Sequence, residues 1–322
     1  MKIVCDDKIP FLRGVFEPYA EVVYLHGAAI SASDVKDADA LVVRTRTRCD
    51  RTLLEGSSVR VIASATIGYD HIDTAWCSEH GIVWANAPGC NAGSVAQWVE
   101  SVLVTLSRSH GFSLVGKTLG IVGVGHVGSK VQALASALGL RTLLCDPPRA
   151  MAEGPAGFVL LDEIIAGADI VTLHVPLTQE TYHMIDASVL GRMRPSQILI
   201  NSSRGEVVDS AALREALQDG RLMAAALDVW ENEPLVDPVL VGLAEIATPH
   251  IAGYSQDGKA AGTTAAVRVV ARTLGLSDLF DFSVALPPVT SAHYDVLQDS
   301  ARLKADISSF ERLRSDYPPR RE

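Results

Sequence analysis

Apolar and polar positions alternate in blocks along the first 90 residues. Short apolar runs of strand length are separated by segments with apolar residues at helical spacing. The predicted strands span residues 2–5, 21–25, 40–43, 59–64 and 82–84. The predicted helices span residues 11–19, 32–38, 51–55 and 71–80. Strands that alternate with helices are typical of a parallel sheet covered on both faces, so this part predicts a small α/β domain.

The same alternation continues after a long amphipathic helix predicted over residues 93–108. Further strands are predicted at 118–122, 142–145, 170–174, 197–201, 223–229 and 246–247. Further helices are predicted at 127–138, 161–166, 187–193 and 210–217. A second long helix, predicted over 258–274, would return the chain to the first domain. We therefore predict an α/β protein with two doubly wound parallel-sheet domains.

The second predicted domain opens with a strand and a glycine-rich turn. Gly123, Gly125 and Gly128 have the spacing G-x-G-x-x-G, with His126 and Val127 between the last two. The first glycine permits a tight turn, the second lets the backbone approach a pyrophosphate, and the third allows close packing of helix on strand. The N-terminus of that helix would present N–H groups to the phosphates. The pattern predicts a Rossmann dinucleotide site that includes these five residues.

Asp146 ends the second strand of this unit, at the position where dinucleotide-binding domains carry an acidic residue. Its carboxylate would accept hydrogen bonds from the ribose hydroxyls and would repel the 2′-phosphate of NADP. NAD is therefore the predicted cofactor. Arg149 lies just beyond, and its charge would weaken the exclusion of NADP.

The composition is that of a globular protein without a nucleic-acid-binding face. The 322 residues suffice for two domains with separate cores, and 48% of them are hydrophobic. The net charge of −10 is opposite to what nucleic-acid binding requires. Five scattered cysteines without a C-x-x-C pair predict neither a disulfide framework nor a zinc site, and no other metal site is predicted.

The N-terminus and the hydropathy profile give no sign of export or membrane insertion. The chain begins with a predicted strand rather than a signal peptide. No apolar run approaches the roughly 18 residues that span a bilayer. We therefore expect a cytoplasmic protein with no membrane partner.

Three predicted strand exits in the second domain carry polar groups suited to hydride transfer from a 2-hydroxy acid. A histidine such as His250 is the natural base for the hydroxyl proton. A neighbouring carboxylate such as Glu233 would raise the pKa of that histidine and orient its ring. Arg204 offers a planar fork to the substrate carboxylate. Each residue alone has an ordinary structural explanation, but their shared position after the dinucleotide motif favours catalysis.

These segments resemble the signatures of the D-isomer-specific 2-hydroxyacid dehydrogenases. The similar stretches are NSSRGEVVD, DVWENEP and PHIAGY. Two further stretches, ANAPGCNAGSVAQWV and HIAGYSQDGKAAGTT, resemble a narrower group within this family. The resemblance implies a flavodoxin-like substrate domain formed by residues 1–92 plus 256–280 and a Rossmann domain formed by 93–255. Residues 281–322 resemble a shortened dimerisation domain, which implies a homodimer.

The resemblance also implies roles for individual residues. Arg204, Glu233 and His250 would form the catalytic trio, and Asp228 would contact the nicotinamide carboxamide. The other residues expected at the cofactor are Ser202, Ser203 and Gly253. The residues expected at the substrate are Thr45, Thr66 and Tyr254.

One strand exit in the first domain favours a phosphorylated substrate. Arg44, Arg46 and Arg48 alternate with threonines, and in an extended segment the arginines would point to one side. We expect Arg44 and Arg46 to bind a substrate phosphate, although surface arginines are an equally ordinary explanation. Arg312 and Arg314 near the C-terminus are second candidates.

The sequence thus predicts an NAD-dependent dehydrogenase for a small phosphorylated 2-hydroxy acid. A dehydrogenase of the same family for another substrate, such as 3-phosphoglycerate or glyoxylate and hydroxypyruvate, remains an alternative. A corepressor-like protein that senses the nucleotide without turnover is a third possibility. The intact trio of Arg204, Glu233 and His250 disfavours it.

Overall fold

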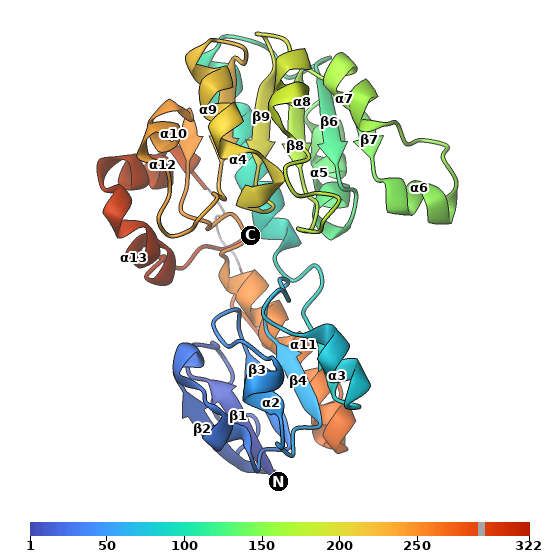
Figure 1. The fold of residues 1–322 in the computed structure, drawn as a ribbon, viewed down its shortest axis with the longest axis vertical. Coiled ribbons are helices and arrows are strands. Elements are labelled where there is room, and N and C mark those ends of the chain that lie inside the picture. The colour runs from blue at the N-terminus through green and yellow to red at the C-terminus, as the bar shows by residue number, and fades with distance from the viewer. Residues whose placement is uncertain (289–293) are drawn as a thin grey trace. The chain divides into compact units, whose positions relative to one another are not determined.

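Two parallel sheets organise the chain (Figure 1). The computed structural model describes residues 1–288 and 294–322. Unit 1 consists of Met1–Asn91, Ser255–Thr290 and Arg321–Glu322. Unit 2 consists of Ala92–Tyr254 and Ser291–Arg320. The predicted α/β class with two parallel-sheet domains is confirmed.

Unit 1 contains a five-stranded sheet in the order β2-β1-β3-β4-β5, in which every pairing is parallel. Its strands are β1 (Lys2–Asp6), β2 (Glu21–Leu25), β3 (Ala40–Val43), β4 (Val61–Ser64) and β5 (Val83–Ala85). The strand order reverses between β1 and β3. In open parallel sheets this reversal creates a crevice at the carboxyl ends of the strands, where ligands bind.

Helices cover both faces of this sheet because alternate strand residues point to opposite sides. One face packs against α1 (Ala32–Val35), α2 (Arg51–Leu54) and α3 (Thr74–Glu79). The other packs against α11 (Gln256–Leu274), whose Val267 and Val270 are fully buried. Two short 3-10 helices, η1 (Gly27–Ala29) and η3 (Ser277–Leu279), complete the unit.

The helix predicted over residues 11–19 is wrong. This segment is a series of turns in which Phe11 and Gly14 have positive φ angles of 61° and 86°. Pro18 adds a residue without a backbone donor, which a helix interior does not tolerate. Leu12 and Phe16 are nonetheless buried in the core beside α11, so the apolar spacing reflects burial rather than helix.

Unit 2 contains a six-stranded parallel sheet in the order β11-β10-β9-β8-β6-β7. Its strands are β6 (Thr118–Val122), β7 (Arg141–Cys145), β8 (Ile170–Leu173), β9 (Ile198–Asn201), β10 (Ala224–Leu227) and β11 (Ile246–Ala247). The order reverses between β6 and β8. All carboxyl ends lie along one edge of the sheet, and the strand exits named above therefore share that edge.

The helices of unit 2 contribute to two separate apolar cores. One core includes residues of α4 (Ala92–Ser109) and α5 (His126–Ala137). The other includes residues of α7 (Leu161–Gly167), α8 (Ala187–Arg192), α9 (Ser210–Gln218) and α10 (Pro238–Leu243). A 3-10 helix, η2 (Gly205–Val207), precedes α9.

The apolar pattern does not predict α10 or α6 (Pro147–Glu153). Each begins with a proline directly after an aspartate whose side chain caps the helix. An aspartate N-cap followed by proline is a favoured helix start. The Asp-Pro sequences at Asp146 and Asp237 therefore indicate these two helices, although the apolar pattern does not.

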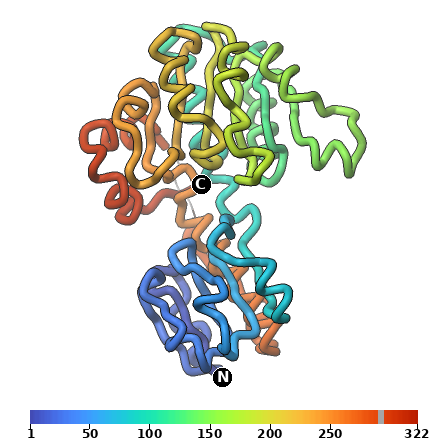
Figure 2. The backbone as a smooth tube through the Cα atoms, in the orientation of Figure 1, coloured from blue at the N-terminus to red at the C-terminus, as the bar shows by residue number. Residues whose placement is uncertain are grey.

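The C-terminal segment packs on unit 2. It forms α12 (Val296–Ala305), η4 (Ile307–Ser309) and α13 (Phe310–Ser315). In Figure 2 this red segment lies beside the orange part that carries α10 and β11. Ser300 Oγ in α12 accepts a hydrogen bond of 3.1 Å from the backbone N–H of Ala247 in edge strand β11.

Two further observations concern residues 1–288 and 294–322. None of their helices is long and apolar enough to cross a membrane. They contain no group of three or more His, Cys, Asp or Glu side chains placed to hold a metal ion.

Candidate active site

The glycine turn after β6 has the geometry that its spacing predicts. Gly123 has a φ of +87°, and a Cβ there would collide with the backbone carbonyl of His174. A Cβ on Gly128 would collide with the carbonyl of Gly123. Above Gly125, by contrast, the space is open. Gly125 caps α5 without a side-chain hydrogen bond, so the helix N-terminus is accessible to a phosphate.

Asp146 at the end of β7 is oriented by two backbone donors. Its Oδ2 accepts a hydrogen bond of 2.8 Å from Val124 N, and its Oδ1 accepts one of 3.0 Å from Arg149 N. The carboxylate is thereby fixed beside the glycine turn. The Arg149 guanidinium donates to both carboxylate oxygens of Glu153 at 2.7 Å. This ion pair offsets the positive charge that would attract a 2′-phosphate.

The loop after β9 presents the next group of predicted residues. The Asn201 side chain organises it, because Oδ1 accepts from Ser203 N and Ser203 Oγ while Nδ2 donates to the Arg204 carbonyl. The Oγ atom of Ser202 is buried and has no protein partner. A buried hydroxyl without a partner is costly unless a ligand satisfies it. The open turn, the oriented Asp146 and this hydroxyl together fit a bound dinucleotide.

Arg204 lies at the exit of β9. One of its guanidinium nitrogens, Nη1, donates to the Ser203 carbonyl at 2.7 Å. The next residue, Gly205, touches the backbone of Trp230, so that any Cβ would collide there. The loop that carries Arg204 is therefore in direct backbone contact with the loop that carries Glu233.

Glu233 and His250 form a hydrogen-bonded pair. His250 Nδ1 and Glu233 Oε2 are 2.7 Å apart, and Glu233 Oε1 accepts a hydrogen bond of 3.0 Å from Trp230 N. Burial raises the pKa of Glu233, but the hydrogen bond and charge of His250, the charge of Arg314 and the Trp230 N–H together outweigh it. The net pKa is lowered, and Glu233 is ionised at neutral pH. Because Nδ1 faces the carboxylate, Nε2 of His250 is the atom left to exchange a proton.

Asp228 holds the loop that carries His250. Its Oδ1 accepts from Thr248 Oγ1 at 2.6 Å and Ile251 N at 2.8 Å, and its Oδ2 accepts from Ala252 N at 2.9 Å. Burial raises the pKa of this carboxyl, against the charge of His250 and these hydrogen bonds. The predicted contact of Asp228 with the nicotinamide remains a prediction, whereas its role in the loop is visible.

Tyr254 has a partner that the sequence did not reveal. Arg314 Nε in α13 donates to the Tyr254 hydroxyl at 3.2 Å. Arg314 Nη1 also lies 3.7 Å from Glu233 Oε2. The apolar pattern contains no signal for these contacts, since they join residues far apart in sequence. Arg312, the other expected phosphate ligand of this segment, is directed to Ser309 and Asp306.

The candidates for substrate binding in unit 1 have a different geometry from the one expected. Residues 44–47 form a turn, closed by a hydrogen bond from Thr47 N to the Arg44 carbonyl at 3.2 Å. The predicted extended segment with all arginines on one side is therefore wrong. Thr45 and Arg46 are exposed, and Thr47 is buried with its hydroxyl on the Gly27 carbonyl.

Arg44 forms an internal ion pair. Its Nε and Nη2 atoms each lie 3.0 Å from an oxygen of Asp6, which is fully buried. The pair sits at the carboxyl ends of β1 and β3, where the strand order reverses. Thr66 follows β4, and its hydroxyl contacts Ser64 Oγ at 2.9 Å.

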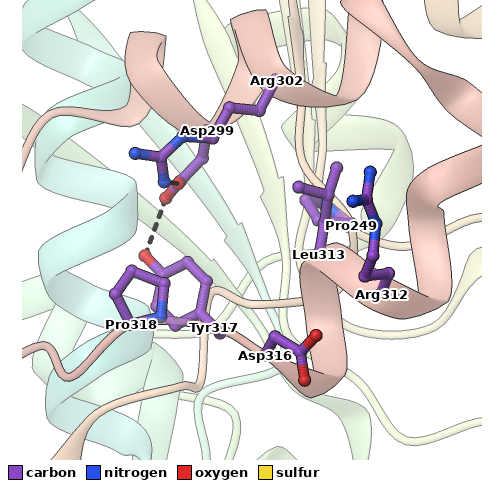
Figure 3. Close-up of a pocket in the computed structure, with 8 residues that line it drawn as sticks. All are labelled: Pro249, Asp299, Arg302, Arg312, Leu313, Asp316, Tyr317 and Pro318. Carbon is purple, nitrogen blue, oxygen red and sulfur yellow. Dashed lines mark hydrogen bonds and ion pairs between the residues drawn. The ribbon is translucent and has the colours of Figure 1, made fainter.

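A cavity of about 280 Å³ lies beside the C-terminal segment of unit 2 (Figure 3). Its lining residues are Pro249, Asp299, Arg302, Arg312, Leu313, Asp316, Tyr317 and Pro318. Asp299 accepts a hydrogen bond of 2.7 Å from the Tyr317 hydroxyl, drawn as a dashed line in Figure 3. Arg302 pairs with Asp299 as well. None of the three predicted catalytic residues lines this cavity.

Comparison with known proteins decides the family. The family model "D-isomer specific 2-hydroxyacid dehydrogenase, NAD binding domain" matches residues 91–252. The chain belongs to the D-isomer-specific 2-hydroxyacid dehydrogenases. The resemblance inferred from NSSRGEVVD, DVWENEP and PHIAGY is thereby confirmed, and so is NAD as the cofactor of this dehydrogenase.

Relatives of this dehydrogenase share its full length. It is 46% identical over 340 residues to the erythronate-4-phosphate dehydrogenase of Bacteroides fragilis, covering 100% of the chain and 97% of the relative. It is 43% identical over 348 residues to the enzyme of that name from Edwardsiella ictaluri, covering 100% and 93%.

Solved structures agree with the fold. D-Lactate dehydrogenase from Aquifex aeolicus, in complex with NAD and lactic acid, has a TM-score of 0.75 at 26% identity, covering 90% of this chain and 100% of that one. NAD⁺-bound 3-phosphoglycerate dehydrogenase from Entamoeba histolytica has a TM-score of 0.72 at 26% identity, covering 89% and 99%.

Replacement of Asp146 by Ala should erode the choice of cofactor. The native dehydrogenase is expected to prefer NAD over NADP by at least about tenfold, or about 1.4 kcal/mol. Asp146→Ala loses the ribose acceptor and the repulsion of the 2′-phosphate, so kcat/KM with NAD should fall toward the value with NADP. Steady-state kinetics with both cofactors measures this. Equal use of NAD and NADP by the native protein would contradict it.

Replacement of His250 by Ala should lower turnover by roughly 10²–10⁴-fold while NAD still binds.

Glu233→Gln should shift the pH–rate profile for oxidation. The ionised Glu233 stabilises the protonated imidazole, which is the inactive form when a proton must be accepted. Loss of this charge should move the rising limb to lower pH. A profile that stays in place would remove Glu233 from the acid–base pair.

Proposed function

We propose that this chain is an erythronate-4-phosphate dehydrogenase. It would oxidise the C2 hydroxyl of 4-phospho-D-erythronate to give 2-oxo-3-hydroxy-4-phosphobutanoate, a step of pyridoxal 5′-phosphate biosynthesis. The observation that carries this proposal is the full-length similarity to relatives of that name at 43–46% identity. The carboxylate-paired histidine at the strand edge supports the chemistry.

The proposed reaction assigns one task to each member of the trio. Arg204 would hold the substrate carboxylate and polarise the C2 oxygen. His250 Nε2 would accept the proton of the C2 hydroxyl, and Glu233 would stabilise the resulting imidazolium. NAD would be held by the glycine turn and Asp146 and would supply the hydride acceptor for the hydrogen on C2. At the substrate, the O–H bond and the C2–H bond would break and a carbonyl would form, with the proton taken by His250.

We assign further substrate contacts to Thr45, Arg46 and Thr66 of unit 1 and to Tyr254 of unit 2. Arg44 is the weaker candidate for the phosphate, because Asp6 compensates its charge. We also infer a homodimer, since the C-terminal segment resembles a dimerisation domain. The inferred location is the cytoplasm. Sedimentation of the purified protein tests the dimer.

A related substrate is the principal competing function. The NAD⁺-bound 3-phosphoglycerate dehydrogenase with a similar fold makes 3-phosphoglycerate a specific alternative. NADH formation with 4-phosphoerythronate, 3-phosphoglycerate and glycolate distinguishes these functions. Tight NAD binding without turnover of any of them would instead favour a nucleotide sensor.

Replacement of Arg204 by Lys should damage catalysis severely with little change in NAD affinity. The lysine keeps the charge but cannot offer two parallel N–H donors to a carboxylate. We expect kcat/KM to fall at least about 100-fold, because charge-assisted hydrogen bonds contribute roughly 1.5–3 kcal/mol each. Fluorescence titration of NAD provides the control. A collapse of NAD affinity would make Arg204 a cofactor or structural residue.

Removal of the substrate phosphate should lower kcat/KM by at least about 100-fold, since each charge-assisted contact contributes on the order of 1.5–3 kcal/mol. Arg46→Ala should reduce the difference in kcat/KM between erythronate and 4-phosphoerythronate. Arg44→Ala should instead lower the melting temperature, because it removes the cation that pairs with the buried carboxylate of Asp6. Comparable kcat/KM for the two acids would contradict the phosphorylated substrate.

A further inference from the structure

The carboxylate of Glu233 has two cationic neighbours rather than one. Oε2 lies 2.7 Å from His250 Nδ1 and 3.7 Å from Arg314 Nη1. Oε1 is occupied by the Trp230 N–H. The same oxygen that orients the catalytic histidine is therefore shared with an arginine from the C-terminal segment.

Solvent screens these charges only weakly. The side chain of Arg314 is 18% exposed and that of Glu233 is 17% exposed. An arginine does not lose its proton in a protein, so its charge is permanent. Opposite charges at this separation in a partly buried setting shift protonation equilibria measurably.

The position of Arg314 is fixed by the segment around it. Phe310 at the start of α13 is buried in a core of unit 2. Tyr317 donates to Asp299, and its ring meets the Tyr254 ring edge-on with centroids 6.0 Å apart. The nearly buried Arg320 donates to the Ala252 carbonyl at 2.5 Å. Residues 310–320 thus line the loop that carries His250 and Tyr254.

We propose that Arg314 is a positioning residue of the active site, which limits the proton affinity of His250 through Glu233 and orients the Tyr254 hydroxyl. The proposal rests on the proposed roles of His250 and Glu233. The carboxylates of Glu233 and Asp228 both face His250 and favour the imidazolium. Arg314 opposes this by compensating part of their charge. The histidine is thereby kept neutral, and ready to accept a proton, at a lower pH than Glu233 alone would allow.

The sign of the effect distinguishes Arg314 from a residue that merely supports the fold. Arg314→Met removes the charge and keeps an unbranched side chain. In the pH–rate profile of this variant for oxidation, the rising limb should move to higher pH by about half a unit to one unit. This direction is opposite to the shift expected for Glu233→Gln. In a Glu233→Gln background the same substitution should shift the limb less. Arg314→Lys keeps the charge and should therefore leave the limb close to its native position.

Arg312→Met is the matched control. Arg312 lies on the same helix, but its side chain is 71% exposed and contacts Ser309 and Asp306. Its pH–rate profile should superimpose on that of the native protein. NAD affinity should be unchanged in both methionine variants.

The outcomes separate this inference from the proposed mechanism. If His250→Ala retains near-native turnover, the proposed mechanism itself fails. If His250→Ala is inactive but Arg314→Met leaves the limb in place or moves it to lower pH, the inference about Arg314 is overturned. If Arg314→Met does not fold, Arg314→Lys decides, because it keeps the charge but loses the Nε–H that Tyr254 accepts. The KM for 4-phosphoerythronate should then rise while the limb stays, and an unchanged KM would reject the contact.

Discussion

The buried carboxylate of Asp228 holds together the loops of the candidate active site. It accepts three hydrogen bonds from the loop after β11, and its backbone carbonyl accepts a fourth from His250 N at 2.7 Å. A buried carboxylate is tolerated only when such bonds compensate for lost hydration. The loop is therefore held to the end of β10, and His250 is held with a φ of 56°, a conformation rare outside glycine.

Tryptophan side chains reinforce this arrangement. Trp230 Nε1 donates to the Thr248 carbonyl, and Trp98 Nε1 of α4 approaches Thr248 Oγ1 at 3.1 Å. Both rings are almost fully buried. The strand edge that carries the Glu233–His250 pair is thus tied to the apolar core beneath it, which limits the motion of the imidazole relative to Glu233.

The sequence predicted those parts of the molecule whose signals are local. The parallel strands, the glycine turn and Asp146 follow from short-range periodicity and spacing, and each strand-exit motif lies within a few residues. The turns at residues 11–19 and the helices that begin after Asp146 and Asp237 were missed because proline and capping override apolar spacing.

The contacts that change the electrostatics could not be predicted from one sequence. Arg44 is paired with Asp6, and Glu233 with Arg314, although these partners lie far apart along the chain. Only the order of the strands brings the first pair together, and only the packing of the C-terminal segment brings the second. A motif specifies which chemical groups are present, whereas the fold decides which of their charges are already compensated.

The backbone contact at Gly205 has a consequence for how this site can evolve. Because a single methyl group there would strike Trp230, the loops that carry Arg204 and Glu233 cannot shift independently. The spacing between Arg204 and Glu233 is thereby constrained by the backbone itself. A ligand of different length would have to be accommodated by other side chains, because the spacing of Arg204 and Glu233 cannot change without rebuilding this contact.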